Sequence, residues 1–170
     1  MTTDERLDRV HTLDGLLGTV ADAMHTEVLL VDPDTPADVA ARRLEREGVS
    51  GAPVVRHGHV VGVVTLRDLF AAGGHHEAAQ TTGPFLRHES ELAGYRVNEL
   101  MTHRPTTVQS TWPLTRAVTL MVDQGVNRLP VVDEDAHVVG ILTRDDILRA
   151  IAAVADPRVH QDRYPRLLPD

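Results

Sequence analysis

Apolar residues in this chain of 170 residues gather in short blocks separated by Gly, Pro or charged residues. In one block they recur every third or fourth position, at Leu114, Ala117, Val118, Met121 and Val122. This spacing predicts a helix with one apolar face. Other blocks are continuous runs of Val, Ile and Leu, such as residues 137–143. Runs of this kind are typical of strands that are covered on both faces, so the pattern predicts buried strands packed against helices.

The same succession of blocks occurs twice. Residues 20–55 align with residues 97–132 without a gap, and residues 59–70 align with residues 137–148. The identical residues are mostly Gly, Pro and Val, together with a Thr and an Asp three positions apart. The division that follows is an N-terminal extension (1–19), repeat one (20–72), a linker (73–96), repeat two (97–153) and a C-terminal tail (154–170).

The first half of each repeat is expected to be a strand followed by a helix. The strand is placed at about Glu27–Val31 in repeat one and Thr106–Val108 in repeat two. In repeat one, Thr35 is expected to cap the helix and Pro36 to occupy its first position, where a missing N–H is tolerated. Gly48, and Gly125 in repeat two, are expected to end the helices in the left-handed conformation.

The second half of each repeat is expected to be two strands and a helix. The strands are placed near residues 53–56 and 59–65, and near residues 129–132 and 137–143. A tight turn at His57-Gly58 joins the first pair. The last helix begins at Thr65 or Thr143. Each repeat therefore reads β-α-β-β-α, which predicts a mixed α/β (α+β) fold with pseudo-two-fold symmetry.

Composition narrows the classes of function. The formal net charge of −8 disfavours nucleic acid as a partner, because such partners require a basic face. The absence of Cys excludes disulfides and thiolate chemistry. An acidic N-terminus and the lack of any apolar run of about 18 residues predict a cytoplasmic protein without a membrane span. No nucleophile or phosphate-binding motif appears, so we expect no enzymatic activity.

Two stretches carry a family resemblance. GVNRLPVVDEDAHVVGILTRDDIL (Gly125 to Leu148), and GVSGAPVV followed by HVVGVVTLRDLF in repeat one, resemble the second half of a CBS (cystathionine-β-synthase-type) domain. The chain is therefore similar to a tandem CBS pair, or Bateman module. The resemblance implies two clefts between the repeats. In relatives such clefts hold AMP, ADP, ATP, NAD, S-adenosylmethionine or a cyclic dinucleotide, and the modules often dimerise.

The resemblance also implies roles for the two Thr/Asp pairs. Asp68 and Asp146 would accept hydrogen bonds from ribose hydroxyls, and Thr65 and Thr143 would contact ribose or phosphate. An ionised carboxylate suits a vicinal diol, and a helix N-terminus suits a phosphate. The alternative is that each pair only marks a helix start. The candidate ligand-binding residues are Val49, Ser50, Ala52, Thr65, Asp68, Val126, Asn127, Arg128, Leu129, Thr143, Arg144 and Asp146.

The two clefts are not expected to be equal. Arg128 and Arg144 flank the second Thr/Asp pair, whereas repeat one has Gly51 and Leu66 at those positions. The hypothesis is that the cleft containing Thr143 and Asp146 is the better nucleotide site. The apolar candidates, such as Val49 and Val126, would form walls beside adenine, or simply pack in the core.

The reading that combines these observations is a non-enzymatic sensor of an adenosine-containing ligand. It would need no cofactor, would form a homodimer and would signal to a separate effector protein. One alternative is a ligand-free structural or dimerisation module. A metal-binding protein is less favoured, because the ten His residues lack a regular ligand spacing, and no metal site is predicted.

Overall fold

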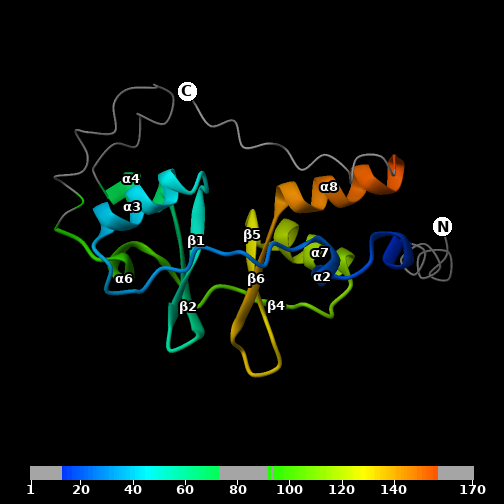
Figure 1. Cartoon of the computed structure of the whole chain (residues 1–170), viewed down its shortest axis with the longest axis horizontal. Coiled ribbons are helices and arrows are strands. Elements are labelled where there is room, and N and C mark those ends of the chain that lie inside the picture. Colours follow the sequence, from blue (N-terminus) through cyan, green and yellow to red (C-terminus); the bar gives the residue numbers. More distant parts are fainter. Residues whose placement is uncertain (1–12, 73–91, 93, 157–170) are drawn as a thin grey trace.

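The computed structural model describes residues 13–72, 92 and 94–156 (Figure 1). The helices are α2 (Val20–Ala23), α3 (Ala37–Arg46), α4 (Leu66–Ala72), α6 (Val97–Leu100), α7 (Leu114–Gln124) and α8 (Arg144–Ala155). The strands are β1 (Gly51–Arg56), β2 (His59–Thr65), β3 (Thr102–His103), β4 (Val108–Gln109), β5 (Arg128–Val132) and β6 (Val138–Thr143). Among these helices, none has the length and apolar character needed to cross a bilayer.

The strands form two small sheets, each with a helical cover. One sheet has the order β1-β2-β3 with antiparallel neighbours, and the other has the order β4-β5-β6, in which β4 and β5 are parallel. Two separate apolar clusters lie between the sheets and the helices. This arrangement confirms the predicted mixed fold.

The leading segment of each repeat packs against the other repeat. Helix α2 of repeat one contacts α7 and α8, and helix α6 of repeat two contacts α3 and α4 (Figure 1). Strand β3 of repeat two joins the sheet of repeat one, and His25 of repeat one pairs with Ile141 on β6. Val20 accordingly lies in the second core and Val97 in the first. The sequence repeats are thus interlocked.

The interlocking explains why both repeats have a glycine at one equivalent position of the alignment. A Cβ at Gly140 would lie 2.8 Å from the carbonyl oxygen of His25 and 2.8 Å from the sulfur of Met24. A Cβ at Gly62 would collide in the same way with Met101. Each glycine therefore leaves room for the methionine of the opposite repeat, which crosses over the sheet.

Three expectations for the first half of repeat one are wrong: the strand, the Thr35 cap and the place of Pro36 at the first helical position. Residues 27–30 form no strand, and only Val31 pairs, in a single parallel bridge to Val54. Thr35 does not cap α3, because the N-cap residue is Pro36 and the helix begins at Ala37. The first helical amide donates instead to the carbonyl of Tyr95. The cap is therefore supplied by the end of the linker, just before repeat two, which the sequence of repeat one alone does not reveal.

The predicted apolar stripe of α7 is correct at its start and too long at its end. Leu114, Ala117 and Met121 are buried, and Val118 packs against the same core. Val122 is 74% exposed, because eight residues after Leu114 the helix has turned that position away from the sheet. Gly125 ends the helix with φ +64°, as expected of a left-handed cap.

The hairpins and last helices agree with the sequence patterns. His57 and Gly58 both have positive φ, as a two-residue turn of the primed type requires. Helix α4 follows Thr65 directly, and α8 follows Thr143. Helix α8 continues to Ala155, into the first residues of the expected tail. The linker falls outside the described residues except for 92 and 94–96, and Leu92 lies in the first core.

Candidate functional site

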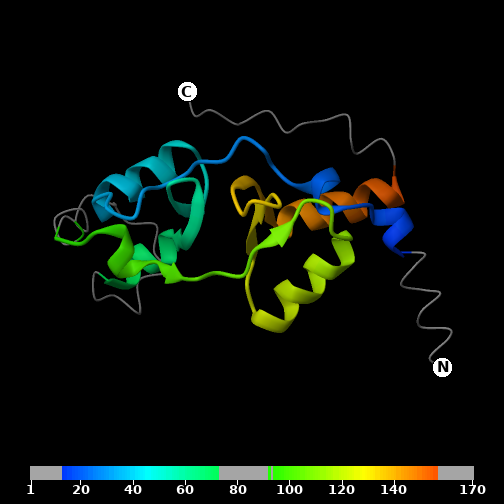
Figure 2. The same cartoon turned by 90° about the horizontal axis from the view of Figure 1, so that it is seen from below.

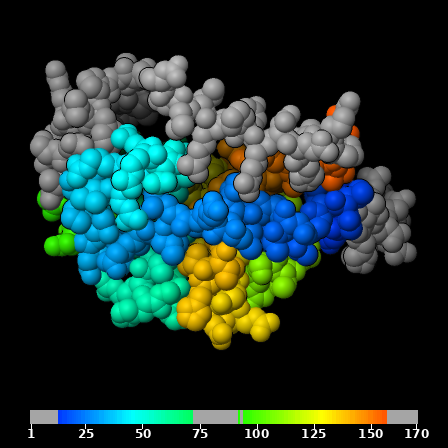
Figure 3. Space-filling view, in the orientation of Figure 1, coloured from blue at the N-terminus to red at the C-terminus, as the bar shows by residue number. Residues whose placement is uncertain are grey.

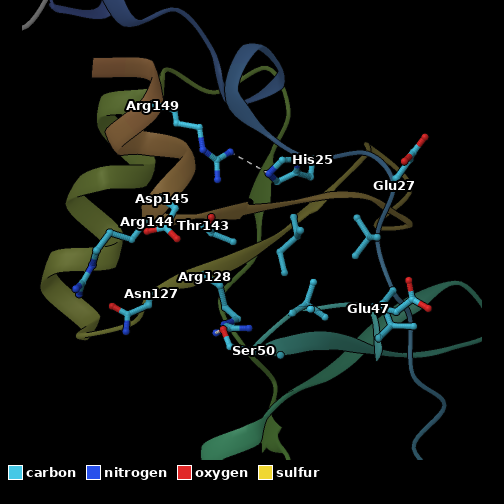
Figure 4. Close-up of a pocket in the computed structure, with 16 residues that line it drawn as sticks. His25, Glu27, Glu47, Ser50, Asn127, Arg128, Thr143, Arg144, Asp145 and Arg149 are labelled. Carbon is cyan, nitrogen blue, oxygen red and sulfur yellow. Dashed lines mark hydrogen bonds between the residues drawn. The ribbon is translucent and has the colours of Figure 1, made fainter. Parts of the chain in front are cut away.

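Two clefts lie between the interlocked repeats. The first, here called the Thr143 cleft, has a volume of about 550 Å³, and its lining residues come from the stretches 25–29, 47–51, 127–128 and 141–149 (Figure 4). The second, the Asp68 cleft, has a volume of about 510 Å³, and its lining residues are Ser50 and residues from the stretches 63–68, 102–106 and 124–129. Each cleft joins the first half of one repeat to the second half of the other.

The crossing segments between the repeats position one wall of each cleft. The chain between α2 and α3 runs across the face of the molecule in Figure 3. Figure 2 shows this segment and the one between β3 and β4 on opposite sides of the molecule. The first contributes Glu27, Val28 and Leu29 to the Thr143 cleft, and the second contributes Arg104, Pro105 and Thr106 to the Asp68 cleft. These walls occupy equivalent positions in the two repeats.

The structure brings most of the candidate residues together at the clefts. Val49, Thr143 and Arg144 line the Thr143 cleft. Thr65, Asp68, Val126 and Leu129 line the Asp68 cleft. Ser50, Asn127 and Arg128 line both. Ala52 and Asp146 line neither, since Ala52 lies in the first core and Asp146 is buried.

Both Thr/Asp pairs form helix-start hydrogen bonds. In each, the backbone amide and the hydroxyl of the Thr donate to Oδ2 of the Asp, at 2.6–2.8 Å. The same pattern occurs at Thr19 and Asp22, which lie outside the clefts and start α2. The alternative structural role therefore accounts for one carboxylate oxygen of each Asp. A role in ligand binding depends on the other oxygen, Oδ1.

Both carboxylate oxygens of Asp146 already contact protein groups. Its Oδ1 lies 2.8 Å from Nε2 of His25 and 2.9 Å from a guanidinium nitrogen of Arg149, and its side chain is completely buried. His25 and Arg149 also approach each other, at 3.3 Å, and both line the Thr143 cleft (Figure 4). In this arrangement, both oxygens of the Asp146 carboxylate are occupied by nitrogen or hydroxyl groups of the protein.

Asp68 differs from Asp146 in this respect. It is half-buried, it lines its cleft, and its Oδ1 has no hydrogen-bond partner among the described residues. The repeat explains the difference, because Thr102 and Ala71 stand where the other repeat has His25 and Arg149. Neither residue carries the ring or guanidinium that contacts Asp146. The Asp68 cleft therefore presents an acceptor that a bound hydroxyl can use.

Arg128 lies between the two clefts. Its backbone pairs with Thr143 across β5 and β6, but its guanidinium reaches the other repeat and donates to Oγ of Ser50 at 2.8 Å. Burial lowers the pKa of Arg128 from its usual value, and the negative charge of Asp68 opposes that shift. A guanidinium stays protonated despite such a shift, so Arg128 brings a partly desolvated positive charge to both clefts.

The clefts differ in charge. Among the residues lining the Thr143 cleft, Arg128, Arg144 and Arg149 are balanced by Glu27, Glu47 and Asp145. Among those lining the Asp68 cleft, Arg67, Arg104 and Arg128 face a single carboxylate, Asp68. The Asp68 cleft is therefore the more cationic of the two.

Sequence reasoning missed the crossing segments as cleft walls. Arg104 and Glu27 occupy the same position in the two repeats and carry opposite charges, as do Arg67 and Asp145. The repeat alignment contained this charge reversal. The functional meaning of this charge reversal becomes clear only from the structure, in which each crossing segment faces the Thr/Asp pair of the other repeat.

A group of potential metal ligands lies away from both clefts, at the β5–β6 turn. Ligand atoms of Asp133, Asp135 and His137 lie within 4.8 Å of one another. Asp133 already accepts a hydrogen bond from the backbone amide of His137, which closes the turn. The linker histidines His75, His76 and His88 lie outside the described residues. The group has the features of a solvated turn.

Comparisons with known proteins agree with this architecture. The family model for the CBS domain matches residues 20–74 and 97–153. A CBS domain-containing protein of Dictyostelium discoideum is 31% identical over 144 residues, which are 81% of this chain and 94% of that protein.

Solved structures show the same arrangement. The structure of CBSX2 in complex with AMP has a TM-score of 0.66 at 33% identity and covers 81% of this chain and 98% of that one. CBSX2 is a CBS-pair protein from Arabidopsis thaliana. The CBS domain pair of protein MJ0100, in complex with 5′-methylthioadenosine and S-adenosyl-L-methionine, has a TM-score of 0.65 at 25% identity, covering 80% and 97%. With two matched repeats interlocked around two clefts, this chain belongs to the CBS domain family and is a tandem CBS pair.

Proposed function

We propose that this chain is a non-enzymatic regulatory module that binds a phosphate-bearing adenosine ligand in the Asp68 cleft. The observation that carries the proposal is that Oδ1 of Asp68, in a cleft lined by three arginines, has no hydrogen-bond partner in the described part of the chain. The complex of CBSX2 with AMP and that of MJ0100 with adenosyl ligands support the ligand class. The cleft volume of about 510 Å³ lies within the range of small-molecule sites.

The parts of the ligand match distinct parts of the cleft. Oδ1 of Asp68 would accept from the ribose hydroxyls while Oδ2 continues to hold Thr65. Val63, Val126 and Leu129 line the cleft with apolar side chains that suit the faces of adenine. Arg67, Arg104 and Arg128 supply the positive charge that a phosphate requires in an acidic protein.

The order of the clefts is the reverse of the order expected from sequence. That expectation assigned Arg128 and Arg144 to the Thr143 cleft and assumed that Asp146 was available. In the structure, Asp146 is bonded to His25 and Arg149, and three carboxylates oppose the arginines of that cleft. We therefore assign the higher affinity to the Asp68 cleft.

A matched pair of variants tests the assignment. Asp68→Ala and Asp22→Ala both remove a helix-start carboxylate, but only Asp68 lies in a cleft. Wild type, these two variants and Asp146→Ala are screened by thermal shift with AMP, ADP, ATP, NAD, S-adenosylmethionine and cyclic di-AMP. A ligand at a hundred times its Kd adds about 2.7 kcal/mol of stability, which raises Tm by roughly 5–10 °C.

For the ligand that binds, loss of a charge-assisted hydrogen bond of about 1.5–3 kcal/mol weakens binding by roughly 10- to 100-fold. This loss is expected in Asp68→Ala and not in Asp22→Ala. Retained affinity in Asp68→Ala, with lost affinity in Asp146→Ala, would restore the order expected from sequence. No shift with any ligand would reject the sensor.

The output of the module is proposed to pass through assembly with a second copy and a separate effector protein. Helix α8 exposes Leu148, Ile151 and Val154, which are 57%, 48% and 44% exposed and lie along one side of the helix. An apolar face of this kind also suits the alternative function, a dimerisation module with empty clefts. Dimerisation without any ligand-induced shift would favour that alternative.

A further inference from the structure

The two clefts share part of their lining. Ser50, Asn127 and Arg128 belong to both, and Arg128 is the charged member of the three. An arginine that lines two clefts is able to face a phosphate in only one of them at a time. A phosphate that binds Arg128 in one cleft therefore makes this positive charge unavailable to a phosphate in the other cleft.

The shared arginine has no counterpart in the other repeat. The equivalent residue in repeat one is Gly51, and the guanidinium of Arg128 lies directly over it. A Cβ at Gly51 would collide with that guanidinium and lie 2.6 Å from the carbonyl oxygen of Val64. The glycine at position 51 thus leaves room for the side chain of Arg128. As a result, one cation lies between the two clefts, where two-fold symmetry would place two.

The position of Arg128 favours the Asp68 cleft when the clefts are empty. Its guanidinium bonds Ser50 and feels the charge of Asp68. A phosphate bound beside Asp68 would hold it there more firmly. The Thr143 cleft would then keep Arg144 and Arg149 against three carboxylates, Glu27, Glu47 and Asp145.

We infer that Arg128 couples the two clefts negatively, so that a phosphate-bearing ligand in the Asp68 cleft weakens binding of a second one in the Thr143 cleft. The inference rests on the proposed function of the clefts. It adds a regulatory property that arises from one side chain. By linkage, occupation of the Thr143 cleft weakens the Asp68 cleft by the same factor.

The experiment uses AMP and adenosine as probes with the full chain. Backbone amide signals of Thr65 and Thr143 report the two clefts separately during an NMR titration. In wild type, AMP reaches the Thr143 cleft while the Asp68 cleft is filled. In Asp68→Ala, the Asp68 cleft stays empty over the same range. We expect AMP to bind the Thr143 cleft about tenfold more tightly in Asp68→Ala than in wild type.

Two further variants assign that gain to Arg128. In the Arg128→Gln background the gain from Asp68→Ala is expected to disappear, whereas Arg128→Lys keeps part of it. Arg56→Gln is the matched control, because Arg56 pairs with Asp34 and lines neither cleft. The gain is retained in that background. Adenosine, which lacks a phosphate, shows no gain in any variant.

The outcomes separate this inference from the proposed function. If neither Thr65 nor Thr143 responds to AMP or adenosine, the ligand-binding function is rejected, and the coupling with it. If AMP binds but the gain is absent in Asp68→Ala, or survives in Arg128→Gln, the coupling alone is rejected. A gain of equal size with adenosine also rejects it, since the effect would then not depend on phosphate.

Discussion

Three Thr/Asp pairs with the same local geometry allow the stability of the fold to be separated from ligand binding. Asp22, Asp68 and Asp146 each hold a helix start through Oδ2. Of the three, only Asp146 also has described partners on Oδ1, namely His25, which is distant in the sequence, and Arg149, three residues further along α8. Replacement by Ala should therefore destabilise the protein most at Asp146, whereas the loss of ligand binding should be greatest at Asp68.

The structure gives the sizes of these effects. Loss of a helix cap costs about 1 kcal/mol, and loss of a hydrogen bond to a charged group costs about 1.5–3 kcal/mol. His25 and Arg149 are 55% and 57% exposed, so both can turn to water once the carboxylate is removed. If the contacts of His25 and Arg149 with Asp146 are counted together as one hydrogen bond to a charged group, Asp146→Ala should destabilise the fold by about 2–4 kcal/mol. Asp68→Ala should lose about 1 kcal/mol, because its Oδ1 holds no described residue.

Urea unfolding of the three variants without ligand checks this order. The difference between Asp146→Ala and Asp68→Ala corresponds to roughly 2–12 °C in Tm for a chain of this length. The slope of the free energy of unfolding against urea should stay the same, so that the midpoint reports stability alone. Equal midpoints for the three variants would mean that the contacts of Asp146 with His25 and Arg149 do not stabilise the folded protein. The argument for an occupied carboxylate would then fail.

Three further predictions address other parts of the structure. Hydrogen bonds from Thr19 lower the pKa of Asp22 below its ordinary value of 3.8. The Asp22 carboxylate therefore stabilises the fold above pH 3.8, and this stabilisation is lost as the pH falls through the folded-state pKa. Thermal unfolding from pH 7 to pH 2.5 should show that the difference in Tm between wild type and Asp22→Asn shrinks below pH 3.8. Gly140→Ala should destabilise by about 1–3 kcal/mol in urea because its Cβ meets backbone, whereas Gly94→Ala, with open space around it, should not. Ile151→Glu should lower the mass measured by light scattering from dimer to monomer if α8 forms the interface, and an unchanged mass would place the interface elsewhere.

Local patterns predicted the elements that depend on neighbouring residues. The turn at His57-Gly58, the left-handed cap at Gly125 and the helix starts at Thr65 and Thr143 are all decided within a few positions of the chain. These features were predicted correctly because backbone geometry and nearby hydrogen bonds determine them. The same reasoning failed at Thr35, where the cap comes from Tyr95. It failed at Val122 because a nine-residue stripe drifts off the buried face.

The two clefts and most of their residues were predicted, but not which segments face each Thr/Asp pair. The repeat alignment identifies equivalent positions, yet it carries no information about which repeat a leading segment packs against. The partners of Asp146 show the limit, because His25 lies more than a hundred residues away and in the other repeat. Arg128 shows it too, since its strand neighbour is Thr143 but its guanidinium contacts Ser50.

Interlocking also explains why two similar repeats form clefts of different character. Each cleft takes its Thr/Asp pair from one repeat and its facing wall from the other, so a substitution in one repeat changes the chemistry around the other's motif. Glu27 faces the pair containing Thr143, whereas its equivalent, Arg104, faces the pair containing Asp68. A charge reversal within the repeat therefore becomes a difference between sites. Because the backbone contacts are shared, such substitutions change the charge of a cleft without requiring a change of fold.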